Sequence, residues 1–404
     1  MTLNLALIGC GGMGRRHIRG MHKLMLTGQQ RFNLVAVCDV YEPNAELATD
    51  LATELLGTTP QRFTSITGAA AAIPDLHAVI ITTAPDSHAD IGIEALNLGL
   101  DVMVEKPIAL TVSQALRLVE AGRQSGRTLA VAENYRRDPI NRLAKAIVDA
   151  GIIGTPYLMI QSSSGSGEKV IITPWRHRKV SGGIVVDMGI HYADILEYFL
   201  GDIESVFANT SVVDQKRVDN EGVWHEADAE DLAVGTVRFA SGAIGNLLID
   251  LAGRGQGHFS RIIHGTDGSL AIPQDRTGNP LILSLRQDGS DHEIDQSELL
   301  NLVPGFRLDP VTAALFGGER LTTYDLPFAD IDANLLAIEQ ADFADAITNS
   351  RDPEVDGAFG LRSLAIAYGL IESEHLGRPA DIATMLQNVD TPYQSELDAA
   401  IAAK

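Results

Sequence analysis

The chain has 404 residues, of which 45% are apolar, and this length is enough for about two or three domains with large cores. Its formal net charge of -22 repels phosphate backbones and anionic lipid, so neither nucleic acid nor a membrane is expected as a partner. The only cysteines, Cys10 and Cys38, make neither a disulfide framework nor a zinc site and fit a reducing cytoplasm. No apolar run is long enough for a transmembrane helix, and the first expected strand leaves no room for a signal peptide.

Short apolar runs alternate with helical patterns up to residue 133, which is typical of parallel βαβ units in a doubly wound sheet. The strand candidates are uniformly apolar, as expected of strands covered on both faces. They cover residues 4–8, 33–38, 78–82, 101–104 and 128–132. Helix candidates between them cover residues 43–56, 87–98 and 111–123. The last two begin on Ser87 and Thr111, which are good N-cap residues.

After residue 133 the pattern changes to longer alternating segments, which predict a large, open, mostly antiparallel sheet. Its strand candidates cover residues 157–163, 205–213, 232–239, 243–251 and 281–285. Helix candidates cover residues 139–150, 187–199, 334–347, 357–376 and the Ala-rich end of the chain. The polar, acidic stretch from Asp214 to Asp231 is expected to be a solvated loop. We therefore predict an α/β protein with a first domain over residues 1–133 and a second α/β domain over residues 134–404.

A glycine-rich segment follows the first strand and opens the next helix. It reads Gly9-Cys10-Gly11-Gly12-Met13-Gly14 and fits the G-x-G-x-x-G pattern of dinucleotide-binding folds. In that pattern Gly9 makes the tight turn, Gly11 lets the backbone approach a pyrophosphate, and Gly14 allows close packing of helix on strand. The alternative is a strand-helix turn without a ligand. The strand before, the helix after and an acid at the right distance favour dinucleotide binding.

That acid is Asp39, which closes the second strand about 25 residues past Gly14. A carboxylate in this place can accept both hydroxyls of an adenosine ribose and repels a 2'-phosphate. No arginine follows it immediately, so NAD is favoured over NADP. The alternative is an aspartate that only caps the next helix.

The third and fourth strands also end at the carboxyl edge of the sheet, where ligands bind in open α/β folds. After the third strand, Thr83, Ala84 and His88 are candidates for cofactor contact, although His88 could simply occupy the first turn of a helix. After the fourth strand come Glu105 and Lys106. Lys106 can donate to a substrate oxygen, and partial desolvation would lower its pKa toward neutrality. The alternative is an ion pair between these two neighbours.

Further candidates lie later in the chain. Asp187 and His191 are four residues apart in an expected helix, so both side chains share one face and can converge on one substrate. A neutral imidazole suits proton abstraction, and a nearby carboxylate can orient it. The alternative is an exposed Asp–His pair. Candidates for contact with nicotinamide or substrate, each of which could instead serve surface packing or a salt bridge, are Asn134, Tyr135 and Arg136. The histidine and acids of residues 224–231 match no standard metal spacing, so no metal is expected.

These motifs together resemble the Gfo/Idh/MocA family, the glucose-fructose oxidoreductase and inositol dehydrogenase group. The resemblance rests on IGCGGMG, on EKP at residues 105–107, and on SGGIVVDMGIHYADILEYFLG at residues 181–201, which fits G-G-x-x-x-D-x-G-x-H. It implies a Rossmann domain followed by an α/β domain whose open sheet often forms the oligomer interface, here of a homodimer or homotetramer. It also implies that Lys106, Asp187 and His191 form the catalytic group and that Trp175-Arg176 reaches cofactor or substrate.

The expected function is an NAD-dependent dehydrogenase that acts on a secondary alcohol of a sugar, polyol or cyclitol. In this hypothesis, hydride leaves for nicotinamide C4 while His191 removes the hydroxyl proton and Lys106 hydrogen-bonds that oxygen. Asp187 positions the imidazole or a second hydroxyl. Two alternatives stay open, an NAD-dependent glycoside hydrolase of the same family and a non-catalytic dinucleotide-binding regulator. The hydrolase is expected to carry a second histidine within residues 183–191, and the regulator need not keep the lysine, aspartate and histidine together.

Overall fold

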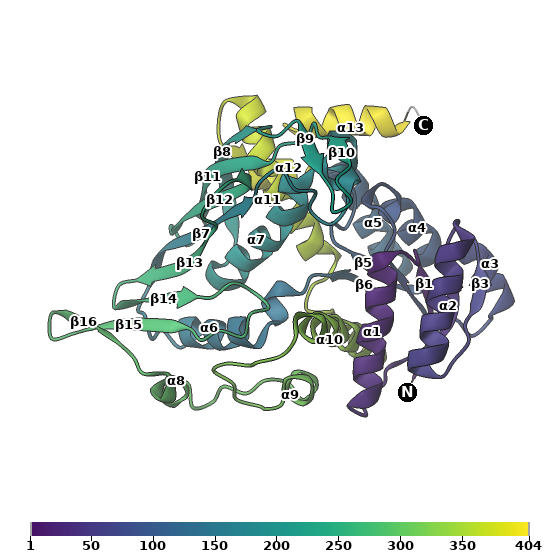
Figure 1. The fold of residues 1–404 in the computed structure, drawn as a ribbon, viewed down its shortest axis with the longest axis horizontal. Coiled ribbons are helices and arrows are strands. Elements are labelled where there is room, and N and C mark those ends of the chain that lie inside the picture. Colours follow the sequence, from purple (N-terminus) through teal and green to yellow (C-terminus); the bar gives the residue numbers. More distant parts are fainter. Residues whose placement is uncertain (1, 403–404) are drawn as a thin grey trace. The chain divides into compact units, whose positions relative to one another are not determined.

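The computed structural model describes residues 2–402, and the chain divides into two compact units (Figure 1). Unit 1 comprises Met1–Arg137, Leu308–Glu319 and Leu326–Leu361. Unit 2 comprises Asp138–Arg307, Arg320–Asp325 and Arg362–Lys404. Each unit has its own sheet. Among the described residues, no helix has both the length and the apolar character needed to cross a membrane.

Unit 1 is built on a parallel sheet with the strand order β3-β2-β1-β4-β5-β6, so the predicted doubly wound sheet is confirmed. The strands are β1 Leu3–Ile8, β2 Phe32–Cys38, β3 Gln61–Phe63, β4 Ala78–Ile81, β5 Asp101–Glu105 and β6 Leu129–Ala132. The order reverses at β1, which pairs with both β2 and β4. Such a switch point is where open α/β sheets bind ligands, outside the carboxyl ends of the strands.

Most helices of unit 1 were predicted, but two short ones, at residues 66–72 and 310–316, were not, and the helices predicted at residues 87–98 and 334–347 begin earlier than expected. They are α1 Gly12–Leu26, α2 Glu42–Leu56, α3 Ile66–Ala72, α4 Pro85–Asn97, α5 Val112–Ser125, α9 Pro310–Phe316 and α10 Phe328–Asn349. Thr111 caps α5 as predicted, since its side chain accepts from the Gln114 N–H. The prediction that Ser87 caps α4 is wrong. The helix begins two residues earlier because Pro85, with its fixed φ and missing N–H, suits the first turn.

A helix from late in the chain completes unit 1. Helix α10 packs against α1 and passes so close to Gly20 that a Cβ there would lie 3.1 Å from the Cβ of Leu336. The division inferred at residue 133 did not anticipate this return of the chain. Its consequence is that side chains of α10 lie among those of α1 inside this unit.

Unit 2 is built on a mixed sheet with the strand order β16-β15-β14-β13-β7-β12-β11-β8-β17. The strands are β7 Pro156–Ser166, β8 Ile203–Ser211, β11 Leu232–Phe239, β12 Ile244–Gly253, β13 His258–Gly265, β14 Gly268–Ile272, β15 Ile282–Gln287, β16 Ser290–Glu293 and β17 Ala380–Asp381. Only the β7–β12 pair within this sheet is parallel, so the predicted large, mostly antiparallel sheet is confirmed.

Helices of unit 2 cover one face of this sheet. The α-helices of the remaining chain are α6 Pro139–Asp149, α7 Ile184–Leu200, α8 Gln296–Leu302, α11 Gly357–Leu376, α12 Ile382–Met385 and α13 Pro392–Ala402. Gly189 lets α7 lie close to its neighbours, since a Cβ there would already be in contact with Ala367 of α11 and Ile249 of β12. The opposite face is not covered by these helices, and along β11 exposed residues alternate with buried ones.

The acidic stretch at residues 214–231 is not a solvated loop throughout, and that prediction is wrong. It contains the antiparallel pair β9 Lys216–Val218 and β10 Trp224–Glu226. Arg217 is only 1% exposed and donates to the Asp231 carboxylate at 2.8 Å. Its guanidinium also donates at 3.0 Å to three backbone carbonyls, those of Gly167, Lys169 and Leu251. These partners compensate the buried charge, although Nε has no hydrogen-bond partner among the described residues, and their convergence depends on segments distant in sequence.

Replacing Arg217 with leucine is expected to lower the free energy of unfolding by about 3–5 kcal/mol, because the Asp231 carboxylate stays buried without its cation. Urea unfolding of the whole protein measures this loss. Arg254→Leu is the matched control, since the Arg254 side chain is 53% exposed in its ion pairs and solvent can replace them. Equal losses in both variants would contradict a structural role for the buried pair.

Candidate active site

The glycine loop lies between β1 and α1, at the switch point of the unit 1 sheet. Gly9 has φ +88°, and a Cβ there would lie 2.8 Å from the backbone of Thr82 and Thr83. A Cβ on Gly14 would lie 2.1 Å from the Gly9 carbonyl oxygen. By contrast, a Cβ on Gly11 or Gly12 would meet no described atom within 4 Å. The loop is therefore packed tightly against the sheet on one side and open on the other.

The open side of this loop is suited to an anion. Helix α1 begins at Gly12, and among the described residues no side chain caps its N-terminus at Gly11. The first N–H groups of a helix have no partners inside the helix and carry a partial positive charge. This arrangement fits the phosphates of a dinucleotide, which can approach the backbone where Gly11 has no side chain.

Asp39 follows β2 and lies beside the same loop. Its Oδ2 accepts from the Cys10 N–H at 2.8 Å, and its Oδ1 accepts from the Tyr41 N–H at 2.8 Å. A carboxylate has about four lone-pair positions, so this anchored group keeps acceptor capacity for the two hydroxyls of a ribose. The Asp39 side chain caps no helix, because α2 begins at Glu42 with Tyr41 as its N-cap residue.

The two cysteines lie in this region as thiols. Both are free and buried. Burial chiefly raises the pKa of the Cys10 thiol to about 12, and the negative charge of Asp39 adds to the shift. Burial likewise raises the pKa of Cys38 to about 12. Both groups are therefore neutral at physiological pH, and Cys10 serves the loop through its backbone N–H.

Strands β1, β4 and β5 end level with one another. Ile8 pairs with Ile81, and Ile81 pairs with Val104. The segments that follow, including Thr83 and Lys106, therefore leave the sheet at the same edge as the glycine loop. Lys106 is only partly buried, whereas its neighbours on both sides are buried, and the peptide bond between Lys106 and Pro107 is cis.

His88 lies between these two segments. It is 1% exposed, with Nδ1 2.8 Å from the Pro107 carbonyl oxygen and Nε2 3.0 Å from that of Thr83. Burial lowers the pKa of His88, which favours the neutral ring. A neutral ring has a single N–H, so it donates to one of these two carbonyl oxygens and packs against the other, between the segment after β4 and the turn after β5. Contact of His88, Thr83 and Ala84 with a cofactor stays a prediction.

Glu105 ends β5 and faces the interior of unit 1. Its Oε1 lies 2.9 Å from His17 Nε2, and its Oε2 accepts from the Lys106 backbone N–H at 3.2 Å. The sequence analysis did not link Glu105 to His17. The only signal was a histidine at helical spacing with apolar residues of α1, such as Met21 and Leu24.

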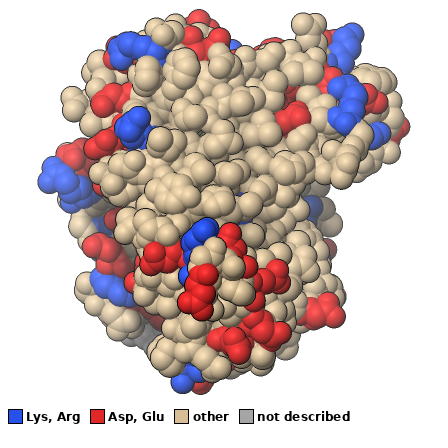
Figure 2. Space-filling model, turned by 90° about the vertical axis from the view of Figure 1, so that its left-hand side faces the viewer, with Lys and Arg blue, Asp and Glu red and all other residues tan. Residues whose placement is uncertain are grey.

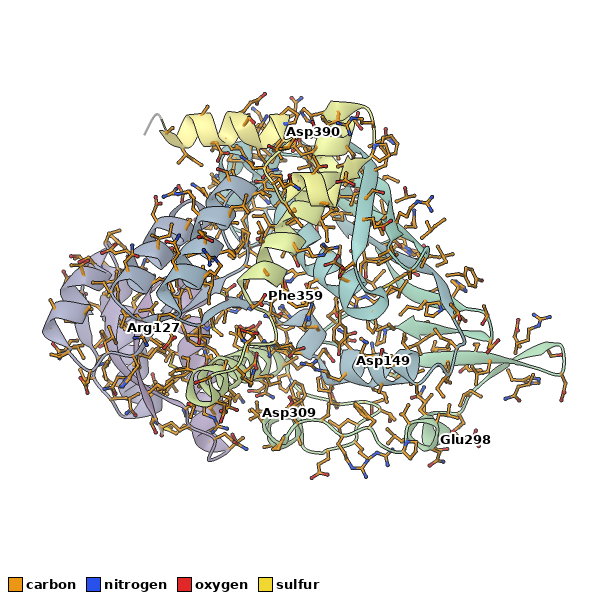
Figure 3. All side chains as sticks on the ribbon, turned by 180° about the vertical axis from the view of Figure 1, so that it is seen from behind. Arg127, Asp149, Glu298, Asp309, Phe359 and Asp390 are labelled. Atoms are coloured by element: carbon orange, nitrogen blue, oxygen red, sulfur yellow. The ribbon has the colours of Figure 1, made fainter. Side chains whose placement is uncertain are left out.

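The segment after β6 also belongs to unit 1. Asn134 and Arg136 are buried there, and Tyr135 is partly buried. The Arg136 guanidinium lies over the ring of Phe359, which is labelled in Figure 3, at 5.1 Å from the centroid. This stacking holds the guanidinium of Arg136 against the aromatic ring.

The candidates of unit 2 lie on α7 and on the short 3-10 helix Pro174–His177. Asp187 and His191 are 8% and 6% exposed. The Asp187 carboxylate forms an ion pair with Arg176, whose guanidinium also lies 4.8 Å from the ring centroid of Trp175. The structure thus joins Trp175, Arg176 and Asp187 into one group. The sequence analysis named all three residues but did not pair the arginine with the aspartate.

Comparisons with known proteins cover both units. Residues 3–133 match the model of an oxidoreductase family with an NAD-binding Rossmann fold, and residues 141–271 match that of the GFO/IDH/MocA C-terminal domain. Levoglucosan dehydrogenase of Pseudarthrobacter phenanthrenivorans is 27% identical, over 92% of this chain and 96% of its own length. The NAD-dependent scyllo-inositol 2-dehydrogenase of Bacillus subtilis is 30% identical, over 71% of this chain and 78% of its own length.

A solved structure supports the same fold. The structure of a levoglucosan dehydrogenase in complex with NADH and levoglucosan is similar to this chain with a TM-score of 0.76 and 23% identity. The alignment covers 95% of this chain and 100% of the levoglucosan dehydrogenase chain. The similarity therefore extends over both sheets.

Proposed function

Because the chain belongs to the GFO/IDH/MocA family of NAD-binding oxidoreductases, we propose that it oxidises a secondary alcohol of a sugar, polyol or cyclitol. Its relatives include enzymes named for levoglucosan and for scyllo-inositol, which are both rich in hydroxyl groups. The single observation that carries the proposal is the edge of the unit 1 sheet, where the open glycine loop, the anchored Asp39 and Lys106 follow neighbouring strands.

Different residues of this edge bind different parts of the cofactor. The backbone of residues 9–14 holds the pyrophosphate, and Asp39 accepts the ribose hydroxyls. Thr83, Ala84, His88, Glu105 and Asn134 shape or brace the remaining cofactor site. Bound NAD supplies a hydride acceptor at nicotinamide C4. Lys106 donates a hydrogen bond to the reacting hydroxyl oxygen, which lowers the energy of the negative charge that develops there.

The proton of the alcohol needs a base, and we assign this role to His191. The substrate then loses a hydride from carbon and a proton from oxygen, which leaves a ketone, reduced cofactor and a protonated imidazole. The ion pair with Arg176 orients Asp187, so that it can hold the imidazole or a second hydroxyl. Tyr135, Arg136, Trp175 and Arg176 supply donors and flat surfaces for the other hydroxyls of the substrate.

A panel of hydroxyl-rich substrates tests this function. The purified protein is mixed with NAD or NADP and with levoglucosan, scyllo-inositol, other cyclitols, aldoses and polyols, and NADH formation is followed by absorbance. We expect reduction of NAD with at least one of them. Release of the aglycone from aryl glycosides is measured in parallel. Tight NAD binding without reduction by any substrate would contradict the proposal in favour of a regulator, and glycoside cleavage without net reduction would favour a hydrolase.

Replacing Asp39 with alanine is expected to weaken NAD binding by roughly 10- to 100-fold, because hydrogen bonds from the ribose to a charged acceptor are lost. Binding of NADP should improve relative to NAD, since the repulsion of its 2'-phosphate disappears. Both dissociation constants are measured by titration of the intrinsic fluorescence. Glu42→Ala, a nearby and more exposed carboxylate on α2, is the control and should change neither value. Unchanged discrimination in Asp39→Ala would contradict the ribose role.

We also propose that the protein is a cytoplasmic homo-oligomer assembled through the open face of the unit 2 sheet. Figure 2 shows a broad stretch with few charged side chains on this side of the molecule. Large apolar residues that are 40–47% exposed on this face are Phe207, Val234, Ile244 and Ile282. Phe207 pairs with Thr236, and Val234 pairs with Leu248, so the apolar surface continues from strand to strand. A second copy of the chain, dimer or tetramer, would bury it.

Val234→Lys in this face is expected to dissociate the oligomer, because each copy would bring an unpaired ammonium into the contact. Sedimentation velocity at several protein concentrations measures the change. Val223→Lys, at a similarly exposed valine outside this sheet, is the matched control and should leave the mass unchanged. A wild-type protein that is monomeric at all concentrations would contradict the proposed assembly.

A further inference from the structure

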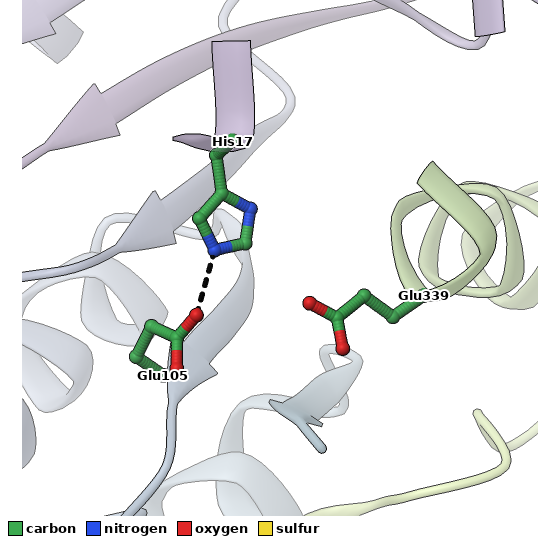
Figure 4. Close-up of side chains that lie close together, drawn as sticks. All are labelled: His17, Glu105 and Glu339. Carbon is green, nitrogen blue, oxygen red and sulfur yellow. Dashed lines mark hydrogen bonds and ion pairs between the residues drawn. The ribbon is translucent and has the colours of Figure 1, made fainter. Parts of the chain in front are cut away.

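A cluster of three buried ionisable side chains lies inside unit 1, and Glu105 connects it to the sheet edge described above. His17 comes from α1, Glu105 from the end of β5, and Glu339 from α10 (Figure 4). Their exposed fractions are 0%, 7% and 0%. One nitrogen or oxygen atom from each lies within 4.8 Å of the others. The cluster therefore collects a nitrogen and two carboxylate ligands from three segments far apart in the sequence.

Two members of the cluster are already ordered by hydrogen bonds. The Gln340 amide donates from Nε2 to His17 Nδ1 at 3.0 Å and to the His17 carbonyl oxygen at 2.9 Å. His17 Nδ1 is thus the acceptor, so Nε2 carries the proton and donates to Glu105 Oε1 at 2.9 Å. The imidazole is neutral in this arrangement, and the second oxygen of Glu105 accepts from the Lys106 backbone.

Glu339 has no such support. Neither of its carboxyl oxygens has a hydrogen-bond partner among the described residues, although the side chain points toward His17 and Glu105. Burial raises the pKa of Glu339 well above its usual range, and the negative charge of Glu105 adds to the shift. Nearby cations are committed elsewhere. Arg137 donates to Asp342 and Glu354, and Arg16 pairs with Asp332.

We propose that His17, Glu105 and Glu339 form a binding site for a divalent cation of the zinc type. The two carboxylates balance the double positive charge, and an imidazole nitrogen with carboxylate oxygens is a ligand set that Zn²⁺ accepts, with water in the fourth place. Bonds of about 2.0–2.1 Å require ligand atoms about 3.4 Å apart, so the His17–Glu105 pair, now at 2.9 Å, must open slightly while Glu339 moves inward. Glu339 is the member able to swing inward, because no hydrogen bond holds it.

Gln340 supplies the matching outer partner. A metal at Nε2 requires the His17 proton to move to Nδ1, which then needs an acceptor. Gln340 Oε1 is buried and has no partner among the described residues. A rotation of that amide places this oxygen against the Nδ1–H and gives up the bond from Nε2 to the His17 carbonyl oxygen. The proton balance is then complete, because His17 only exchanges tautomers and the single proton released comes from the Glu339 carboxyl.

The cation would act as a structural clamp, which goes beyond the proposed dehydrogenase function. It would join α10 to α1 and to the end of β5. Glu105 also holds the backbone N–H of Lys106, so the clamp would fix the start of the turn that carries the lysine. No step of the alcohol oxidation passes through this site.

Titration of the full-length, chelator-treated protein with Zn²⁺ tests the proposal. We expect about one Zn²⁺ per chain by equilibrium dialysis with elemental analysis, a higher Tm, and about one proton released, seen as a buffer-dependent heat of binding. Co²⁺ in place of Zn²⁺ should give visible absorption of a four-coordinate nitrogen and oxygen site. Mg²⁺ and Ca²⁺ should bind far more weakly, because they prefer larger sets of oxygen ligands.

Glu339→Gln is the decisive variant, since it keeps the shape of the side chain and removes its charge. We expect Zn²⁺ binding at least about 100-fold weaker, while the metal-free Tm stays at or above that of the wild type. Glu354→Gln, a less buried glutamate of the same unit, is the matched control and should bind as the wild type does. If the wild type bound no Zn²⁺, or if Glu339→Gln bound Zn²⁺ as tightly as the wild type, the proposal would be overturned. Glu339 would then be a buried carboxyl group without a role in metal binding. These measurements need no substrate, so their outcome is independent of the dehydrogenase assay.

Discussion

Replacing Lys106 with methionine is expected to lower kcat for alcohol oxidation by roughly two to four orders of magnitude. Methionine keeps most of the apolar stem but removes the ammonium that donates to the reacting oxygen. The lysine follows β5, whose end is in register with the ends of the strands that precede the glycine loop and Thr83. Loss of its ammonium should therefore lower kcat. Steady-state kinetics with NAD, together with the NAD dissociation constant, measure the effect.

The split between these two quantities separates catalysis from folding. NAD binding should change by no more than a few-fold, because the glycine loop and Asp39 remain intact. Lys145→Met removes a lysine of α6 in unit 2 that pairs with Asp149, and it should leave kcat unchanged. Full activity in Lys106→Met would contradict the assigned role of the ammonium. An equal loss of NAD binding and kcat would show a disturbed fold instead.

The second large effect is expected from two alanine substitutions in the glycine loop. In Gly14→Ala the new Cβ would lie 2.1 Å from the Gly9 carbonyl oxygen, so strand and helix must separate. We expect a loss of about 1–3 kcal/mol in the free energy of unfolding and an NAD affinity too weak to measure. In Gly11→Ala no described atom lies within 4 Å of the new Cβ. This variant should be as stable as the wild type. Its affinity for NAD should nevertheless fall by about tenfold or more, because the methyl group lies where the pyrophosphate approaches.

Thermal melting and NAD titration on the same samples distinguish the two effects. Gly305→Ala is the control for an unhindered glycine, since its added Cβ also meets no described atom within 4 Å. It should alter neither property. If Gly11→Ala bound NAD as tightly as the wild type, the open side of the loop would not be the place where the pyrophosphate lies.

The fold was predictable wherever burial is continuous along the chain. Strands β1, β4, β5 and β6 are almost wholly buried, so their apolar runs are visible in the sequence. The sequence analysis missed β3, whose three residues are exposed or partly exposed and carry no such pattern. It also placed the start of α4 at Ser87, because the preference for serine as a cap was weighed above the preference for proline in the first turn.

Contacts between distant segments were beyond the reach of pattern analysis. Arg217 lies in a stretch with the composition of a surface loop, yet its partners come from three other parts of the chain. The return of α10 onto α1 likewise has no local signal. The burial of Glu339 beside His17 follows from that return.

In the candidate site, too, single residues were predictable from the sequence, whereas contacts between them were not. The glycine loop, Asp39 and Lys106 were identifiable because each follows a strand of a parallel sheet, and that topology brings strand ends to one edge. Pairings within the site were not identifiable. The ion pair between Arg176 and Asp187 depends on how a short 3-10 helix lies against α7, and the packing of His88 depends on two separate turns.

Isotope transfer from substrate to cofactor tests the central claim most directly. The substrate identified by the panel is deuterated at its carbinol carbon and oxidised in ordinary water by the wild-type protein with NAD. The proposed reaction predicts that the reduced cofactor carries the deuterium at nicotinamide C4 and that a ketone forms in equal amount. Reduced cofactor without deuterium, or deuterium lost to water while the substrate is cleaved, would contradict it.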